Sequence, residues 1–292
     1  MSDYHIPVLR DEALTFLSIR SKGKYIDATL GGGGHTREML ERGAFVLGID
    51  ADSDAIQNAE QEFEDHLTNH QLTVVRGNFR DIKKIAHLHD FIDPEGILFD
   101  LGVSSHQLDA KERGFSFRNE ALLDMRMDLS LSVTAADLLN GLGKKELYRL
   151  FLEYGEEKDA YKIANSVVRA REEKPIQTTT ELAELIRKTV RRYDGIHPAT
   201  LAFQALRIAV NDELVSLQVA LPDAFDLLGK KGRLVVISFH SLEDRIVKEF
   251  LSLKEKEGAG KIITKKIVVP SEEEIKRNNR SRSAKMRVIE KI

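Results

Sequence analysis

The sequence lacks cysteine altogether and has no excess of positive charge. Its 292 residues include 44 Lys and Arg against 47 Asp and Glu, for a net charge of -3. The absence of cysteine excludes disulfides, a thiolate nucleophile and a cysteine-based zinc site. The charge balance excludes a protein that coats nucleic acid with a uniformly basic surface, but it permits local basic patches.

Long hydrophobic runs are missing as well. No run approaches the roughly 18 apolar residues of a membrane-spanning helix, and residues 1–5 lack the basic and apolar regions of a signal peptide. We therefore expect a soluble, cytoplasmic protein that does not contact a membrane. Its length fits one large domain or two.

Short apolar runs alternate with stretches of helical spacing along the first hundred residues. The expected strands are residues 24–28, 45–50, 72–75 and 96–100, and the pattern returns at 232–238. Strands separated by helices indicate βαβ units and a parallel sheet that is buried on both faces. Ligands of such sheets bind at the carboxyl ends of the strands, where this chain has glycines and aspartates. The sequence therefore predicts a Rossmann-like α/β domain.

This alternation stops between residues 110 and 198, where we find helical and loop patterns but no convincing strand. Thr178 and Glu181 have the spacing of a capping box that opens a helix. One long helix is expected from about Thr200 to Leu217. We predict an α/β domain of residues 1–109 and 199–292, interrupted by a helical domain of residues 110–198.

Four glycines, Gly31 to Gly34, lie between the first expected strand and the helix after it. Such a loop lets a ligand approach the backbone, and the helix N-terminus adds N–H donors and positive potential. Asp50 ends the next strand, at about the spacing of an acid that binds ribose hydroxyls. This pair predicts a cofactor of nucleoside type.

Two nucleoside cofactors fit this pattern to different degrees. The dinucleotide motif G-x-G-x-x-G would need a third glycine at Thr36, and no P-loop motif exists. S-adenosylmethionine has no pyrophosphate, so it needs only a glycine loop for its methionine part and an acid for its ribose. The sequence favours S-adenosylmethionine over NAD and leaves an NAD-type oxidoreductase as an alternative.

Several separate strings occur in the order typical of one bacterial family. They are His5-x-Pro7-Val8-Leu9, Asp27 to His35, Asp100 to Ser105, Gln107 to Asp109, Arg113 to Phe117, Asp124 to Asp128, His197 to Thr200, Phe203 to Asn211, Ser238 to Arg245 and Arg282 to Lys285. With these strings the chain resembles, almost end to end, the ribosomal RNA small subunit methyltransferase H family. The resemblance implies a Rossmann-like methyltransferase sheet with an inserted helical domain that helps to hold RNA.

The resemblance also implies a pocket for S-adenosylmethionine. Its residues are Gly33, Gly34, His35, Asp50, Phe79, Asp100 and Gln107. The glycines and His35 are expected at the methionine end, Asp50 at the ribose hydroxyls and Phe79 against the adenine. Asp100 and Gln107 are expected to complete the pocket.

The activity implied by the resemblance is N4-methylation of a cytidine in the decoding region of 16S ribosomal RNA, within the small ribosomal subunit. An exocyclic amine needs hydrogen-bond acceptors as it reacts, so Asp100 and Ser104 are our candidate catalytic residues. The target base must be unpaired or flipped. A non-catalytic RNA-binding assembly factor with a relic cofactor pocket is a second alternative.

The sequence does not assign a role to several other histidine, serine and acidic residues. No acid cluster completes the pairs His66/His70 or His87/His89, so no metal site is predicted. Residues 238–244 contain the residue types of a catalytic triad without a G-x-S-x-G elbow, which favours a strand end followed by a capped helix. The family resemblance suggests that this segment lies close to the active site.

Each group of candidate RNA-contacting residues has two possible interpretations. Phe115, Phe117 and Phe239 are candidate stacking surfaces, but residues of this type more often belong to a core. The arginines Arg113, Arg126 and Arg207 fit phosphate contacts or internal ion pairs equally well. The run from Lys276 to Arg287 has six basic residues and no acid, which fits a mobile tail or a phosphate-binding arm.

Overall fold

The computed structural model describes residues 7–190, 195 and 197–292, so His5 of the family strings lies outside the described residues. The chain divides into two compact units, Met1–Ser104 with Leu214–Ile292 and Ser105–Glu213. We call them the sheet unit and the helical unit. These limits differ from the boundaries expected from the sequence, at 109/110 and 198/199, because residues 200–211 pack with helices of the helical unit.

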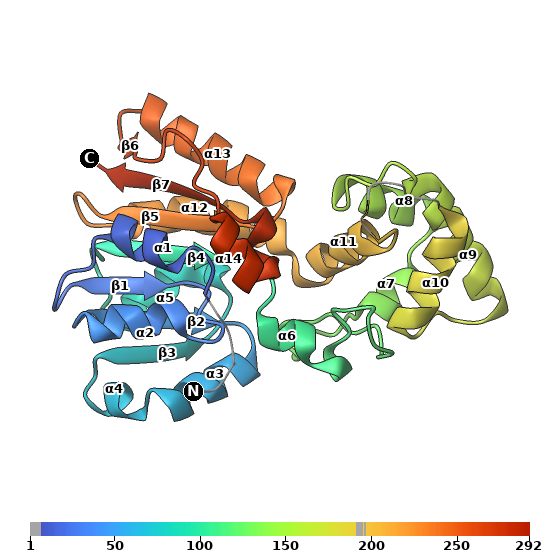
Figure 1. Cartoon of the computed structure of the whole chain (residues 1–292), viewed down its shortest axis with the longest axis horizontal. Coiled ribbons are helices and arrows are strands. Elements are labelled where there is room, and N and C mark those ends of the chain that lie inside the picture. Colours follow the sequence, from blue (N-terminus) through green and yellow to red (C-terminus); the bar gives the residue numbers. More distant parts are fainter. Residues whose placement is uncertain (1–6, 191–194, 196) are drawn as a thin grey trace. The chain divides into compact units, whose positions relative to one another are not determined.

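The sheet unit is built on one seven-stranded sheet (Figure 1). The strands are β1 (Lys24–Asp27), β2 (Phe45–Asp50), β3 (Leu72–Arg76), β4 (Gly96–Asp100), β5 (Arg233–Ser238), β6 (Gly260–Ile262) and β7 (Lys285–Lys291). Their order is β3-β2-β1-β4-β5-β7-β6. The first five strands are parallel, and β7 is antiparallel to both β5 and β6. The five strands expected from the sequence are confirmed, and β6 and β7 were not predicted.

Helices cover both faces of this sheet. They are α1 (Arg10–Leu17), α2 (Gly34–Glu41), α3 (Ser53–Glu62), α4 (Glu64–Thr68), η1 (Phe79–Asp81), α5 (Ile82–Leu88), α12 (Glu213–Leu227), α13 (Ser241–Lys256), α14 (Glu272–Arg277) and η3 (Asn279–Ser283). Successive strand residues point to opposite faces, so Tyr25 and Leu98 pack with α1, α2 and α3. Ile26 and Phe99 pack on the other face with α5, α12 and α13. The sheet is therefore buried on both sides, as its apolar strands require.

The helical unit contains no strand among its described residues, only an isolated bridge between Leu122 and Thr178. Its elements are α6 (Ser105–Asp109), η2 (Lys111–Arg113), α7 (Ala135–Gly141), α8 (Lys144–Glu153), α9 (Ala160–Glu173), α10 (Thr179–Thr189) and α11 (Thr200–Asn211). The predicted capping box is confirmed, because the Thr178 hydroxyl accepts from the Glu181 N–H and the Glu181 carboxylate accepts from the Thr178 N–H. No helix of the described ranges has both the length and the apolarity needed to cross a membrane.

Two expectations about the chain path are corrected by the structure. The long helix expected from Thr200 to Leu217 is two helices, because Asp212 between α11 and α12 has a φ of 50° in the left-handed region. The basic run from Lys276 to Arg287 is not a mobile tail. Its residues form the end of α14, η3 and the first half of β7, where Arg287 donates to the Asp244 carboxylate at 2.7 Å.

Candidate functional site

The glycine loop lies between β1 and α2, where it needs glycine for both conformation and space. Gly31 and Gly33 have φ values of 49° and 72°, in the left-handed region that favours glycine. A Cβ atom on Gly33 would lie 2.6 Å from the Phe63 ring, and one on Gly34 would lie 2.9 Å from the Pro7 ring. Phe63 and Pro7 therefore pack closely against the backbone of the loop.

We expect Gly33→Ala to lower the free energy of unfolding by about 2–4 kcal/mol, because left-handed strain and steric overlap add together. Gly258→Ala is the matched control, since Gly258 has a φ of 71° and no atom within 4 Å of an added Cβ. The control should lose only the strain, about 1 kcal/mol. Urea denaturation of both variants measures the difference, and equal losses would show that Phe63 yields without cost.

Asp50 ends β2 and holds the glycine loop directly. Its Oδ2 accepts from the Gly31 N–H at 2.7 Å, and its Oδ1 accepts from the Asp52 N–H at 2.9 Å. Burial raises the pKa of Asp50 to about 6. Each carboxylate oxygen keeps a second lone pair, so Asp50 can accept two further hydrogen bonds from a diol.

Phe79 follows the neighbouring strand β3. The Gly77 N–H donates to the Asp50 carbonyl oxygen at 2.8 Å, which brings the loop before Phe79 to the end of β2. The Phe79 ring is half-buried and packs edge-on against Phe99, with 5.6 Å between ring centroids. Its position after β3 is consistent with a surface for a flat ring beside Asp50.

Asp100 ends β4, and its carboxyl group is only partly satisfied. Its backbone N–H donates to the Thr29 hydroxyl at 2.6 Å, but its buried Oδ1 has no hydrogen-bond partner among the described residues. Burial, together with the negative charges of Asp27, Glu243 and Glu274, raises the pKa of Asp100 well above its ordinary value. A buried acceptor without a donor costs about 1–3 kcal/mol. Oδ1 is therefore suited to a donor from a ligand.

His35, at the start of α2, faces the other oxygen of Asp100. The ring is buried, with Nε2 3.2 Å from the Val8 carbonyl oxygen and Nδ1 3.7 Å from Asp100 Oδ2. A carbonyl oxygen only accepts, so Nε2 carries a proton and the Nδ1 lone pair of the neutral ring faces the carboxyl group. Nδ1 is therefore the ring atom of His35 that faces the carboxyl group of Asp100.

Ser104 and Gly102 lie in the loop after β4, close to two other parts of the site. A Cβ atom on Gly31 would lie 3.9 Å from Ser104 Cβ, so Ser104 lies beside the glycine loop. A Cβ atom on Gly102, which has a φ of 95°, would lie 3.6 Å from the Phe239 ring. The loop after β4 therefore runs from the end of β5 towards the glycine loop.

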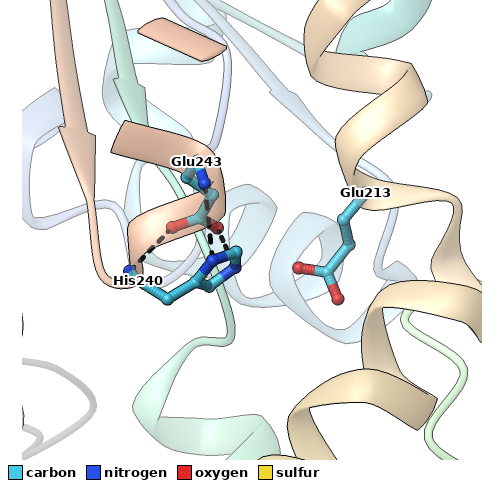
Figure 2. A group of neighbouring side chains, drawn as sticks. All are labelled: Glu213, His240 and Glu243. Atoms are coloured by element: carbon cyan, nitrogen blue, oxygen red, sulfur yellow. Dashed lines mark hydrogen bonds and ion pairs between the residues drawn. The ribbon is translucent and has the colours of Figure 1, made fainter. Parts of the chain in front are cut away.

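His240 and Glu243 form a buried pair where β5 passes into α13 (Figure 2). Glu243 Oε2 accepts from the backbone N–H groups of Phe239 and His240, at 2.8 and 3.3 Å. In return, His240 Nδ1 accepts from the Glu243 N–H at 3.4 Å. The strand end and capped helix expected from the sequence are confirmed.

Asp27 is the acid of this site that sequence reasoning missed. It ends β1 as Asp50 and Asp100 end β2 and β4, and that repeated position was the available signal. The side chain is buried, accepts from the Thr36 hydroxyl at 2.7 Å and accepts from the Thr29 N–H at 3.3 Å. Burial raises the pKa of Asp27 to about 6.

We expect Asp27→Asn to raise the free energy of unfolding at pH 7.5 by about 1–3 kcal/mol, because it removes a buried charge. The amide oxygen still accepts from the Thr29 N–H, and the amide nitrogen donates to the Thr36 hydroxyl in place of the bond that Asp27 accepts. The folded pKa of Asp27 is raised from 3.8 to about 6, so the folded protein binds the proton more tightly. The contribution of Asp27 to stability therefore falls as the pH rises from about 4 to about 6. The advantage of Asp27→Asn should shrink over the same range on acidification.

Urea denaturation between pH 4 and pH 7.5 measures this effect, with the exposed Asp65→Asn as the control. Asp65→Asn should leave the stability nearly unchanged at every pH. A deficit of Asp27→Asn at pH 7.5 would show that the charge of Asp27 is stabilised in the folded protein.

Gln107 and the aromatic candidates Phe115 and Phe117 belong to the helical unit. Gln107 is buried in α6 and Phe115 is buried as well. Phe117 stacks on His197, with 4.4 Å between ring centroids, and meets Phe203 edge-on. A part for Gln107 in the cofactor pocket stays a prediction.

The three candidate phosphate-binding arginines, Arg113, Arg126 and Arg207, make contacts inside the helical unit. The Arg113 guanidinium donates to the carbonyl oxygens of Arg126 and Met127, at 3.1 and 3.0 Å. Arg126 donates to both oxygens of Asp124, and Arg207 donates to both oxygens of Glu213 at 2.8 and 2.9 Å. These contacts favour an internal role for all three side chains.

The strand order β3-β2-β1-β4-β5 and the glycine loop at its switch point define a Rossmann-like protein that binds a nucleoside-type cofactor. The antiparallel β7 beside β5 departs from the dinucleotide-binding order, in which a sixth strand follows in sequence. The model of the MraW methylase family matches residues 2–292. The chain belongs to this family, which confirms the family and fold class predicted from its sequence.

Curated relatives match over the full length of the chain. A ribosomal RNA small subunit methyltransferase H from Heliobacterium mobile is 48% identical, with all of both chains covered. The protein of the same name from Coprothermobacter proteolyticus is 46% identical, over 100% of this chain and 98% of its own. Among solved structures, an rRNA methylase from Streptococcus thermophilus has a TM-score of 0.48 and 9% identity, over 98% of each chain.

Proposed function

We propose that the chain transfers the methyl group of S-adenosylmethionine to the N4 amino group of a cytidine in the decoding region of 16S ribosomal RNA. The observation that carries this proposal is the full-length identity of 46–48% to proteins named ribosomal RNA small subunit methyltransferase H. The substrate is the assembled or nearly assembled small subunit. Its folded shape and its phosphates suit a protein whose net charge is only -3.

The residues of the sheet unit fit S-adenosylmethionine. The glycine loop leaves no room for a Cβ atom at Gly33 or Gly34, and Asp50 keeps lone pairs for the two ribose hydroxyls. We propose that Gly33, Gly34 and His35 hold the methionine end and that Phe79 lies against the adenine. Asp100 completes the proposed pocket in the sheet unit, and Gln107 of the helical unit is the further cofactor residue that the family resemblance implies.

Asp100 and Ser104 are the proposed catalytic residues. Bound S-adenosylmethionine supplies an electrophilic methyl group on a positively charged sulfur. The lone pair of the cytosine amine is delocalised into the ring, so the amine needs acceptors that hold its protons while the nitrogen becomes tetrahedral. Asp100 Oδ1 accepts one N4–H bond and then takes the proton, and Ser104 Oγ is the second acceptor.

His35 supports this step through Asp100. Its Nδ1 lies 3.7 Å from Asp100 Oδ2, so it stabilises the carboxyl group once that group has gained the proton. Much of the remaining rate enhancement comes from positioning and from exclusion of water. The base reaches these groups only when it is unpaired or flipped out of a helix, and Phe239 beside Gly102 is the proposed apolar surface that receives it.

Methyl transfer from labelled S-adenosylmethionine to small subunits that lack the modification tests the proposal. The expected product is N4-methylcytidine, identified by nucleoside analysis of the 16S rRNA. Subunit binding without transfer would favour the assembly factor with a relic pocket. Binding of NAD in place of S-adenosylmethionine would favour the oxidoreductase.

A further inference from the structure

Two buried side-chain atoms in the described part of the chain have no hydrogen-bond partner, Asp100 Oδ1 and His240 Nε2. Asp100 ends β4, and His240 follows the neighbouring parallel strand β5. Asp100 is the register partner of Ile237, and the Leu101 N–H donates to the Ile237 carbonyl oxygen at 2.9 Å. His240 comes three residues after Ile237. Both unsatisfied atoms therefore lie at the same carboxyl edge of the sheet.

The two atoms differ in hydrogen-bond character. The Glu243 N–H can only donate, so His240 Nδ1 is an acceptor and the proton of the neutral ring lies on Nε2. Glu243 Oε1 lies 3.1 Å from Nε2 but out of line with its N–H, so it holds the ring without accepting that proton. His240 Nε2 is therefore a donor without an acceptor, and Asp100 Oδ1 is an acceptor without a donor.

We infer that His240 is a specificity-determining residue that donates from Nε2 to the ring N3 of the target cytosine, while Asp100 Oδ1 accepts from its N4 amine. This inference rests on the proposed function and adds a residue that reads the base. Cytosine presents a donor at N4 next to an acceptor at N3, which complements the two protein groups.

The same pair of contacts rejects two of the other bases. Uracil has a carbonyl oxygen and an N–H at the corresponding positions, so it would place acceptor against acceptor and donor against donor. Guanine has the same reversed pattern. A site built to pair with a polar group discriminates strongly against a base that leaves its buried groups unpaired. Adenine has the matching pattern but a second ring, so size rather than hydrogen bonding excludes it.

Two substitutions separate base reading from the structural role of His240 in capping α13. In His240→Asn the amide oxygen takes the place of Nδ1 and keeps the cap, but the Nε2 donor is lost. In His240→Gln the amide nitrogen takes the place of Nε2, but the cap is lost. We expect kcat/KM for the small subunit to fall about 10- to 100-fold in His240→Asn and about fivefold or less in His240→Gln.

Both variants should bind S-adenosylhomocysteine with Kd values within about threefold of that of the unmodified protein. A thermal melt of each variant reports the cap, and His240→Gln should have the lower Tm. If His240→Gln loses more activity than His240→Asn, His240 acts only as a cap and the inference is overturned.

A substrate change tests the contact itself. In small subunits with 3-deazacytidine at the target position, N3 is replaced by a C–H group and the acceptor is lost. On this substrate kcat/KM of the unmodified protein should fall by the same factor as kcat/KM of His240→Asn falls on cytidine. Combining His240→Asn with the 3-deazacytidine substrate should lower kcat/KM no further than either change alone. If the two changes instead lower kcat/KM independently, His240 contacts a group other than N3 and the inference is overturned. Absence of transfer to any cytidine by the unmodified protein would instead overturn the proposed function.

Discussion

Asp100→Asn is expected to lower kcat by on the order of 10²- to 10⁴-fold, the range typical for loss of a proton-accepting group. The amide keeps one oxygen as an acceptor but cannot take the proton that leaves the amine. Affinity for S-adenosylhomocysteine should change by less than about tenfold, because Asp50 and the glycine loop remain. Single-turnover methyl transfer to the small subunit measures kcat, and calorimetry measures the affinity.

The pH profile of the same reaction distinguishes a proton acceptor from a structural residue. Asp100 has to be ionised to accept a proton, and its pKa is raised well above the ordinary value. The rate of the unmodified protein should therefore rise with pH through that raised pKa, whereas Asp100→Asn should lack this limb. Asp81→Asn, at an exposed acid after β3, is the control and should keep both the rate and the profile. An active Asp100→Asn enzyme with an unchanged profile would exclude Asp100 as the acceptor.

Asp50→Ala is expected to raise the Kd for S-adenosylhomocysteine by about 10²- to 10⁴-fold. Hydrogen bonds to a charged group contribute about 1.5–3 kcal/mol each, and Asp50 is positioned to offer two to the ribose. The substitution also removes the acceptor of the Gly31 N–H, so the glycine loop loses its direct tie to β2. Calorimetric titration with S-adenosylhomocysteine measures the effect.

Glu60→Ala is the matched control for Asp50→Ala, because Glu60 is an exposed acid on the following helix α3. It should bind S-adenosylhomocysteine like the unmodified protein. Circular dichroism at the titration temperature checks that both variants are folded. Unchanged binding by folded Asp50→Ala would exclude Asp50 as the ribose ligand.

Local patterns were enough to predict much of the fold. The expected strands 45–50 and 96–100 coincide with β2 and β4, because an apolar run ending in an acid is a local feature. The capping box of α10 was predicted for the same reason, since Thr178 and Glu181 are three residues apart. By contrast, the helical periodicity continues across Asp212, so spacing alone could not show that the backbone turns there.

The C-terminal strand shows why other features could not be predicted. Lys285–Lys291 is rich in charge and resembles a tail by composition, yet Met286 and Val288 are fully buried. They are buried because β7 pairs with β5, about fifty residues earlier in the chain. The hydrogen bonds between β7 and β5 decide the structure of this segment, and no local pattern contains them.

The sequence by itself determined the positions of the first five strands along the chain, the glycine loop and the acids that end β2 and β4. These features depend on neighbours within a few residues, so spacing and residue type suffice. Only the tertiary structure decided that Asp27 is buried beside the glycine loop and that His35 faces Asp100. It alone decided that His240 Nε2 makes no hydrogen bond. These properties arise from burial and from contacts between residues far apart in the chain, which one sequence does not specify.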